Sequence, residues 1–452
     1  MRLAKSITNG LAVVGVFLLV LIGSQTFAQE NSPYSRYGLG DLVPTQNIAM
    51  RGMGGISAGM PSFQNINFSN PASLGNINNY QYTNTIFDLG GEVDIHTLKS
   101  NLTPDKYKST NAIISYLQLA FPIASQKMER KKKFWAVSLG LRPLTRISYK
   151  IRKDERLNLI GDSLQTLYEG SGGLYQANIG TGLRIKNFSI GINTGYTFGR
   201  KDYSTRLIFE NDSVAYYKTN TEAITTFGGV FLNTGVQYSI TTKNKGMLVL
   251  GGYLNWQNDL NANRNKINET FTYSSTGAAY TIDTVDYRSD ETGKIKMPVT
   301  YGIGFTYQDK ERNWLLGADF EASNWSRYRF YNETDDVRNS WMIRVGAQYL
   351  PWKQNAARTN YWSFVKYRAG FQYGIDYIKV VSNQMTYNAT LGMSFPLTSL
   401  NRIRLGETVS LNTSIEFGGR VNNQSLGLRD NYLRFGFGVS MNARWFQKRN
   451  YD

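Results

Sequence analysis

Apolar and polar residues alternate with a period of two over stretches of about ten residues, and this pattern recurs along most of the chain. In the clearest stretch, near the C-terminus, the odd positions are apolar and the even positions small, polar or charged: Leu433, Phe435, Phe437, Val439, Met441, Ala443 and Trp445 against Arg434, Gly436, Gly438, Ser440, Asn442 and Arg444. Because a Lys or Arg facing lipid at mid-bilayer costs about 2–4 kcal/mol, the apolar set is predicted to face outward from a membrane barrel.

The same alternation predicts fourteen strands in all. They lie near residues 80–90, 112–123, 134–141, 174–185, 188–199, 227–240, 246–256, 299–308, 314–322, 341–350, 364–376, 383–395, 408–419 and 432–446. An even number is the rule for single-chain bacterial barrels. The 30 Tyr, 23 Phe and 8 Trp suit the aromatic girdles of such a barrel better than a soluble sandwich, which rarely exposes so many aromatic side chains. The predicted fold is therefore all-β, a transmembrane outer-membrane barrel of about 14 antiparallel strands.

The connections between these segments test the topology. With both termini in the periplasm, short turns near 186–187, 241–245 and 309–313 fit the periplasmic side. The stretches near 142–173, 200–226 and 257–298 are long and polar, and they are predicted to be extracellular loops.

The first segment predicts export. Arg2 and Lys5 precede a twelve-residue apolar run, 11–22, and a plausible cleavage site follows Ala28. The run is shorter than the roughly 18–20 residues that a spanning helix needs, so residues 1–28 are predicted to be a cleaved signal peptide. No other segment is apolar enough for a membrane helix, which leaves a closed sheet as the way to span a membrane. The expected location is the outer membrane of a Gram-negative bacterium.

Residues 29–79 show little alternation and are predicted to be a plug inside the lumen of the barrel formed by residues 80–452. Their apolar residues argue against a free tail: Met50, Met53, Ile56, Met60, Phe63, Ile66 and Phe68. The glycines within the plug let backbone pack closely against a wall or adopt positive φ. Asn70 before Pro71 favours an extended or turning backbone.

Two motifs in the plug resemble the FadL family of outer-membrane transport proteins. They are the glycine-rich stretch 51–60 and the Asn-Pro-Ala stretch within 68–74. The resemblance implies an N-terminal hatch followed by fourteen strands, and passive transport of long-chain fatty acids or other hydrophobic compounds by hatch rearrangement. A PorV-like subset of the family serves type IX protein secretion instead, so a non-transporting subunit of a secretion or assembly complex is the alternative function.

The candidate ligand-binding or gating residues are those of the plug motifs: Gly52, Gly54, Gly55, Asn70, Pro71 and Ala72. The alternative is that they only determine the shape of the plug. Candidate lumen-lining residues are the charged ones on inward positions: Arg344, Lys366, Arg368, Asp376 and Glu416, with Asp319 and Glu321 beside them. These either receive the headgroup of a ligand or brace the barrel against its plug.

The sequence has few residues suited to catalysis or to binding a metal or cofactor. The only histidine, His96, falls in the first predicted extracellular loop, and there is no cysteine, so neither an enzyme, a metal site nor a cofactor is expected. The net charge of +17 raises nucleic acid as a partner, but an exported protein rarely meets it and no recognition motif is present. The expected partners are outer-membrane lipids, with either a hydrophobic small molecule or other outer-membrane or periplasmic proteins.

Overall fold

The computed structural model describes residues 32–62, 64–77, 85–99, 106–123, 126–157, 162–209, 217–352, 360–379, 384–398, 407–421 and 429–443. The predicted signal peptide, both ends of the predicted plug, Phe63, Arg444 and Trp445 lie outside the described residues. No helix within the described ranges is long and apolar enough to cross a membrane.

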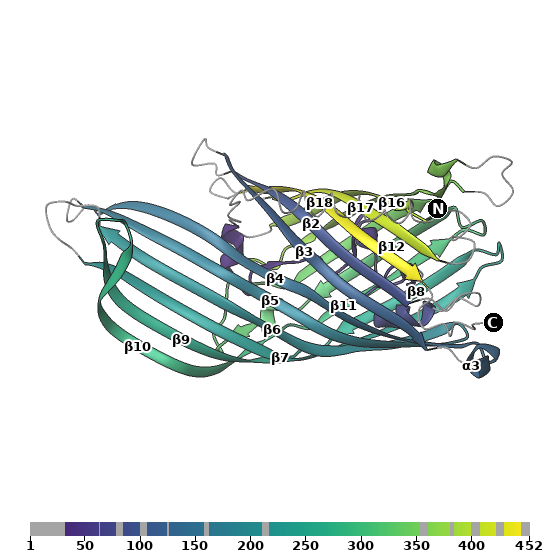
Figure 1. The fold of residues 1–452 in the computed structure, drawn as a ribbon, viewed down its shortest axis with the longest axis horizontal. Helices are drawn as coiled ribbons and strands as arrows, with labels where there is room; N and C mark the ends of the chain where they lie inside the picture. Colours follow the sequence, from purple (N-terminus) through teal and green to yellow (C-terminus); the bar gives the residue numbers. More distant parts are fainter. Residues whose placement is uncertain are drawn as a thin grey trace, which may run out of the picture.

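Fourteen antiparallel strands of the described chain form a closed barrel, which confirms the predicted fold class (Figure 1). They are β2 (Thr85–Lys99), β3 (Lys106–Ile123), β4 (Lys133–Leu157), β5 (Asp162–Ile185), β6 (Phe188–Phe209), β7 (Lys218–Thr241), β8 (Met247–Asn255), β11 (Thr300–Gln308), β12 (Trp314–Ser323), β14 (Ser340–Tyr349), β15 (Lys366–Ile375), β16 (Met385–Pro396), β17 (Thr408–Val421) and β18 (Arg429–Ala443). Neighbours in this order are hydrogen-bonded, and β18 pairs with β2 to close the ring.

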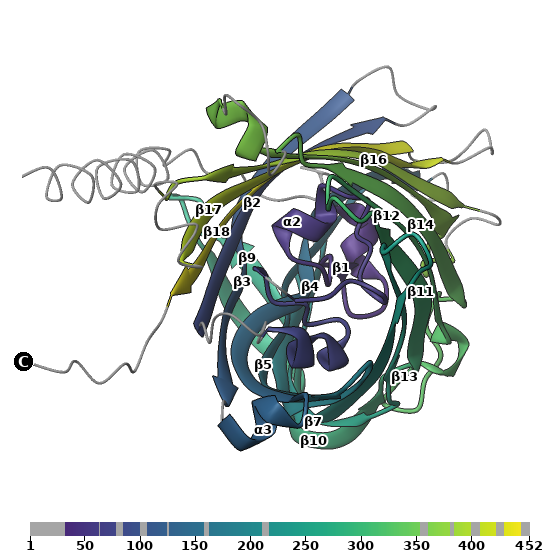
Figure 2. The same ribbon diagram turned by 90° about the vertical axis from the view of Figure 1, so that its right-hand side faces the viewer.

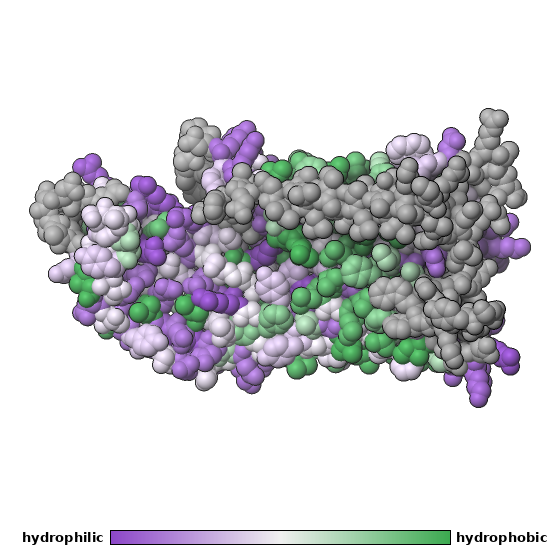
Figure 3. All heavy atoms as spheres, viewed as in Figure 1, coloured by the Kyte–Doolittle hydropathy of each residue, from purple (hydrophilic) through white to green (hydrophobic). Residues whose placement is uncertain are grey.

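The predicted alternation sets which side chains face the lumen. On β6, Ile190, Ile192 and Tyr196 are exposed, whereas Ser189 and Asn193, at alternate positions, are buried. The exposed apolar side chains of neighbouring strands form a belt at one end of the long axis of the molecule. Polar side chains predominate at the other end (Figure 3). The belt has the properties of a lipid-facing surface, because apolar area is stable there and inward polar groups are kept from lipid.

The strands differ greatly in length. β8, β11, β12, β14 and β15 have 9 or 10 residues, about the length that spans a bilayer. By contrast, β4 to β7 have 22 to 25 residues and continue beyond the belt. β9 (Asp259–Tyr273) and β10 (Ala279–Lys296) continue the sheet from β7 (Figure 1). We call the projecting parts of β4 to β7, with β9 and β10, the outer extension.

The outer extension corrects the loops predicted near 142–173, 200–226 and 257–298, because most of these residues form strands. The outward faces of these strands lie beyond the apolar belt and are largely polar, so most of the stretches lack the regular alternation that identifies a half-buried strand. The short turns near 186–187, 241–245 and 309–313 lie at the opposite end of the barrel, as predicted. The rule that periplasmic turns are short places the outer extension on the extracellular side.

The predicted position of His96 is also wrong. This residue lies within β2 and not in a loop, because β2 continues to Lys99 opposite β18. Its Nδ1 atom is 3.0 Å from a carboxylate oxygen of Asp430, so its ring is held by the barrel wall.

Residues 32–77, which we call the luminal segment, run inside the ring of strands (Figure 2). Their short elements are η1 (Pro33–Arg36), β1 (Asp41–Leu42), α2 (Ile48–Arg51) and η2 (Pro71–Asn76). Most of their side chains are buried, and β1 pairs with the edge of β4 where β4 has separated from β3. The remaining short elements are α3 (Gln126–Arg130), η3 (Trp325–Arg327), β13 (Arg329–Phe330) and η4 (Tyr361–Phe364).

Replacement of Ile303 by lysine tests the belt. Ile303 on β11 is 60% exposed within it, so Ile303→Lys is expected to lower the free energy of unfolding by about 2–4 kcal/mol. The midpoint of urea unfolding of the barrel in lipid vesicles measures this loss. Ile282→Lys, at an exposed isoleucine of the outer extension, is the matched control and is expected to leave the midpoint unchanged. Equal losses in the two variants would show that the belt does not face lipid.

Candidate functional site

The luminal segment contacts the barrel wall backbone to backbone at its glycines. A Cβ atom on Gly392 of β16 would lie 2.7 Å from the Cα of Gly52. Gly54 has φ of +70°, and a Cβ atom there would lie 2.4 Å from the carbonyl oxygen of Val345 on β14. Neither position has room for a side chain, so the glycines of the first motif let the segment lie directly on the wall.

The Asn-Pro-Ala motif packs against β6 and β7 in the same way. Asn70 caps η2 by accepting a hydrogen bond from the Ala72 N–H at 3.1 Å. Its amide nitrogen donates to the carbonyl oxygens of Ala58 at 2.7 Å and Val236 at 3.2 Å. A Cβ atom on Gly191 of β6 would lie 2.3 Å from the carbonyl carbon of Pro71. The motif thus shapes η2 and seats it on the wall.

A buried ionic network joins the luminal segment to the seam where the barrel closes. The Arg51 guanidinium binds Glu92 on β2 and donates from Nε to Glu416 on β17 at 2.6 Å. Arg434 on β18 binds Asp94 on β2 at 2.5 Å and Glu416 at 3.5 Å. Arg51 is 1% exposed, so its charge depends wholly on these two carboxylates for compensation.

On the opposite wall, the segment is held by Asp319 of β12. One carboxylate oxygen accepts hydrogen bonds from the backbone N–H groups of Ser57 at 2.6 Å and Ala58 at 2.8 Å. Nearby, Arg344 of β14 pairs with Glu321 at 2.9 Å. The Nε and Nη1 atoms of Arg344 are buried without a hydrogen-bond partner among the described residues.

The other predicted lumen residues lie apart from one another. Lys366 binds the side chain of Gln64 in the luminal segment. Arg368 is held by Gln348 at 2.8 Å and Ser394 at 2.5 Å, both on the wall. Three of the five candidates, Arg344, Asp376 and Glu416, line one cavity, whereas Lys366 and Arg368 lie outside it. The contacts made by Arg344, Lys366 and Arg368 resemble the bracing arrangement more than a shared carboxylate site.

The outer mouth of the lumen holds a second network centred on Arg420 of β17. Its guanidinium binds Asp41 of β1 at 2.8 Å, Asp376 at 2.6 Å and Asp430 at 3.3 Å. The Tyr377 hydroxyl donates to the carbonyl oxygen of Gly40. Asp376, the remaining lumen candidate, thus helps to fasten the start of the luminal segment.

An apolar cluster packs around these contacts. It combines the luminal segment with the outer extension and the residues after β12 and β15: Tyr34, Leu39, Leu174, Phe227, Leu260, Ala262, Ile295, Trp325, Tyr328, Tyr377 and Ile378. Burial of this many large side chains stabilises the contact between the segment and the outer extension. The cluster occupies the mouth through which a solute would have to enter.

A cavity of about 370 Å³ remains between the mouth and the body of the luminal segment. Its wall mixes charged side chains, including Arg51, Arg344 and Glu416, with apolar ones, including Phe231 and Trp341. Arg142 also lines it and bonds to Gln176 at 3.0 and 2.8 Å. Such a lining suits water or an amphipathic group, since it offers both charged partners and apolar surface.

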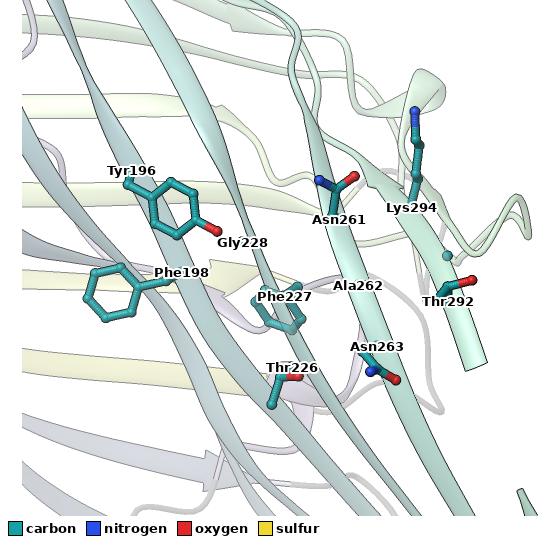
Figure 4. Close-up of a pocket in the computed structure, with 11 residues that line it drawn as sticks. Tyr196, Phe198, Thr226, Phe227, Gly228, Asn261, Ala262, Asn263, Thr292 and Lys294 are labelled. Atoms are coloured by element: carbon teal, nitrogen blue, oxygen red, sulfur yellow. The ribbon is translucent and has the colours of Figure 1, made fainter. Parts of the chain in front are cut away.

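A second hollow, of about 740 Å³, lies on the outer surface where β7 changes partner from β8 to β9. Figure 4 shows the rings of Tyr196 and Phe198 on one side and the amides of Asn261 and Asn263 on the other. Lys294 of β10 lies at its far margin. Aromatic rings beside polar groups are typical of the level at which a barrel leaves the bilayer.

Sequence reasoning missed most members of the two ionic networks. Glu92, Asp94 and His96 lie beyond the predicted end of the first strand. Arg51 entered the prediction only as the first residue of the glycine-rich stretch. The inward position of Arg434 was predicted from the alternation of β18. No cluster of His, Asp or Glu among the described residues could hold a metal ion.

The fold is similar to that of solved outer-membrane transporters. The P. putida toluene transporter TodX matches with a TM-score of 0.56 and 15% identity, over 90% of this chain and 100% of TodX. A Pseudomonas aeruginosa FadL homologue matches with a TM-score of 0.54 and 15% identity, over 89% and 99% of the two chains. The Ralstonia pickettii toluene transporter TbuX matches with a TM-score of 0.50 and 12% identity, again over 89% and 99%. No curated protein matches the sequence.

The closed ring and these likenesses define an outer-membrane β-barrel of the FadL-like fold. The sequence profile of one family, BamG, matches residues 11–452. The chain belongs to the BamG family.

Substitution of a wall glycine is expected to displace the luminal segment. The chain has no cysteine, so Ser73→Cys, at a fully buried position of η2, reports exposure of the segment through its reaction with a maleimide. Gly191→Ala places a methyl group against Pro71 and is expected to speed this labelling severalfold or more. Gly252→Ala is the control, because its Cβ atom would meet nothing closer than 3.5 Å. Unchanged labelling in Gly191→Ala would mean that the contact does not hold the segment.

Loss of Arg51 is expected to destabilise the barrel. Arg51→Met leaves three buried carboxylates, Glu92, Asp94 and Glu416, with only two cations, Arg146 and Arg434, beside them. The uncompensated charge is expected to cost about 3–5 kcal/mol in the free energy of unfolding. Urea unfolding in detergent micelles measures the loss. Adding Glu416→Gln removes one uncompensated charge and is expected to restore part of it; no recovery would show that the interaction is not ionic.

Proposed function

We propose that this protein is a non-transporting barrel subunit of an outer-membrane protein assembly complex. The observation that carries the proposal is the fastening of the luminal segment along the whole lumen. Glycine contacts hold it at Gly52 and Pro71, the Arg51 network holds it at the seam, and the Arg420 network holds it at the mouth. Opening such a lumen would require breaking several buried contacts together.

Three further features support this function. The outer extension offers a broad protein surface beyond the belt, which a simple channel does not need. Charged side chains such as Arg51, Arg344 and Glu416 lie in the wall of the cavity left in the lumen, beside apolar ones. The name of the BamG family points to the outer-membrane assembly machinery. The same proposal includes export by the predicted signal peptide and partnership with other outer-membrane or periplasmic proteins. It also includes the PorV-like secretion role that the FadL resemblance raises.

The second candidate is passive transport of a hydrophobic or amphipathic small molecule, such as a long-chain fatty acid. The likeness of the fold to TodX, TbuX and a FadL homologue supports a transporter role. In this case the predicted gating residues, Gly52, Gly54, Gly55, Asn70, Pro71 and Ala72, would have to leave the wall during each passage.

A tether between the luminal segment and the wall separates the two functions. Asn65 of the segment donates to Ser440 of β18 at 2.5 Å, so Asn65→Cys and Ser440→Cys can be joined by a short bifunctional thiol reagent. A static subunit is expected to keep its function when tethered, measured as the amount of folded outer-membrane proteins in cells that depend on the variant. The two single-cysteine variants treated alike are the controls. Loss of fatty-acid uptake only in the tethered protein would overturn the proposal in favour of transport.

Gentle detergent extraction of the tagged protein, followed by mass spectrometry of proteins and lipids, tests the same choice directly. Protein partners in fixed stoichiometry with no bound fatty acid are expected. A solitary barrel that carries a fatty acid would reverse the conclusion.

A further inference from the structure

Strand β10 forms an edge of the outer extension, and most of this edge has no partner strand among the described residues. β10 pairs with β9 along its length but with β13 only at Ile295 and Lys296. Tyr331 donates two more hydrogen bonds, from its backbone N–H to the carbonyl oxygen of Lys294 at 3.0 Å and from its hydroxyl to that of Glu291 at 2.9 Å. Residues 279–290 therefore present a free row of backbone donors and acceptors, which at about 3.3 Å per residue is on the order of 40 Å long.

Natural proteins usually block such an edge with proline, lysine or a covering loop. The free stretch contains no proline and no lysine, and its apolar side chains are exposed: Tyr280 by 56%, Val285 by 69% and Tyr287 by 60%. Aromatic and β-branched residues of this kind favour strand pairing. The stretch also carries three aspartates, Arg288 and bulges in its pairing with β9, features that discourage indiscriminate pairing. The edge therefore favours a strand that compensates its charges.

The opposite edge of the outer extension shows how the molecule treats an edge that has a partner. Where β4 leaves β3, β1 pairs with it through Asp41 and Leu42, and Val43 donates to the carbonyl oxygen of Leu144 at 2.9 Å. The luminal segment thereby completes that edge by adding a strand. The described residues supply no such strand to β10 beyond the short pairing of β13 with Ile295 and Lys296.

The charge of the free edge restricts what can pair with it. Although the chain has a net charge of +17, residues 279–291 carry four carboxylates and one guanidinium, Arg288. Asp286 forms an ion pair with Arg288 at 3.2 Å, and Glu291 forms one with Arg264 at 2.9 Å. Asp283 has none within ion-pair distance among the described residues. The same edge of a second copy would bring carboxylates together, whereas a strand carrying lysine or arginine would compensate them.

We propose that β10 binds an extended, cationic segment of a partner outer-membrane protein by β-strand addition. The segment pairs with the backbone of residues 279–290 and places its basic side chains beside Asp283 and Asp286. Bulges in the pairing with β9 leave Ile282 and Val285 outside that register, where they can contact side chains of the added strand. This inference rests on the proposed function, because it names the surface through which an assembly subunit meets its partner.

Cross-linking in intact cells tests the pairing. Single cysteines at Thr281, Asp283, Val285 and Tyr287 in the full-length protein carry a photoreactive thiol reagent, and mass spectrometry identifies the linked peptides. An added strand is expected to give links that advance in order along one extended, basic segment of one partner protein. A cysteine at Tyr196, on the barrel belt, is the control and is expected to miss that segment. Links to lipid, to a second copy, to scattered partner residues or to nothing would overturn the proposal.

Charge reversal distinguishes failure of this inference from failure of the proposed function. Asp283→Lys with Asp286→Lys is expected to lower recovery of the partner by about tenfold or more, because like charges then face each other. Asp154→Lys with Glu155→Lys, on the far edge of the outer extension, is the matched control. If the wild-type protein has partners and the β10 variant keeps them fully, the edge proposal alone fails. If the wild-type protein has no protein partner, the proposed function fails with it.

Discussion

Contact between two backbones, that of the luminal segment and that of the wall, is the constraint on which the rest of this barrel depends. A ring of fourteen strands encloses a wide space, and an empty polar space of that kind fills with water. Here the space is occupied by a segment that has few regular elements of its own. Such a segment can lie on the wall only where glycines such as Gly392 and Gly191 leave room for it. Its remaining polar groups then reach wall partners such as Asp319.

The ionic contacts connect the packed luminal segment to particular strands of the barrel. Arg51 extends from the luminal segment to β2 and β17, which lie on either side of β18. Arg434 of β18 binds carboxylates of the same two strands. The first and last strands of the barrel are therefore joined by side chains inside the lumen as well as by their backbone hydrogen bonds. This arrangement links the position of the segment to the integrity of the ring, which is why we favour a static role over repeated opening.

The alternation of side chains predicted the barrel because lipid and lumen impose opposite demands on successive residues. All fourteen strands were found this way, and the inward position of Arg434 followed from the same rule. The rule fails for β9 and β10 because their outward faces lie beyond the belt and do not have to be apolar, although Leu260, Ala262 and Ile295 are buried. It also cannot identify partners: Arg51 is 365 residues from Glu416 in sequence, and only the curvature of the closed sheet brings them together. For the same reason the lumen candidates could be predicted singly but not as the separate contacts that they form.

The pairing of β1 with β4 has a consequence for biogenesis. β1 lies inside the ring and precedes every barrel strand in the chain, so the segment that contains it is synthesised before the strands that it contacts. Because the contacts of Arg51 lie at the joint between β18 and β2, they become complete only when that joint forms. The wall is thus expected to assemble around its contents, with the N-terminal residues serving as an internal template on which the two ends of the sheet find each other.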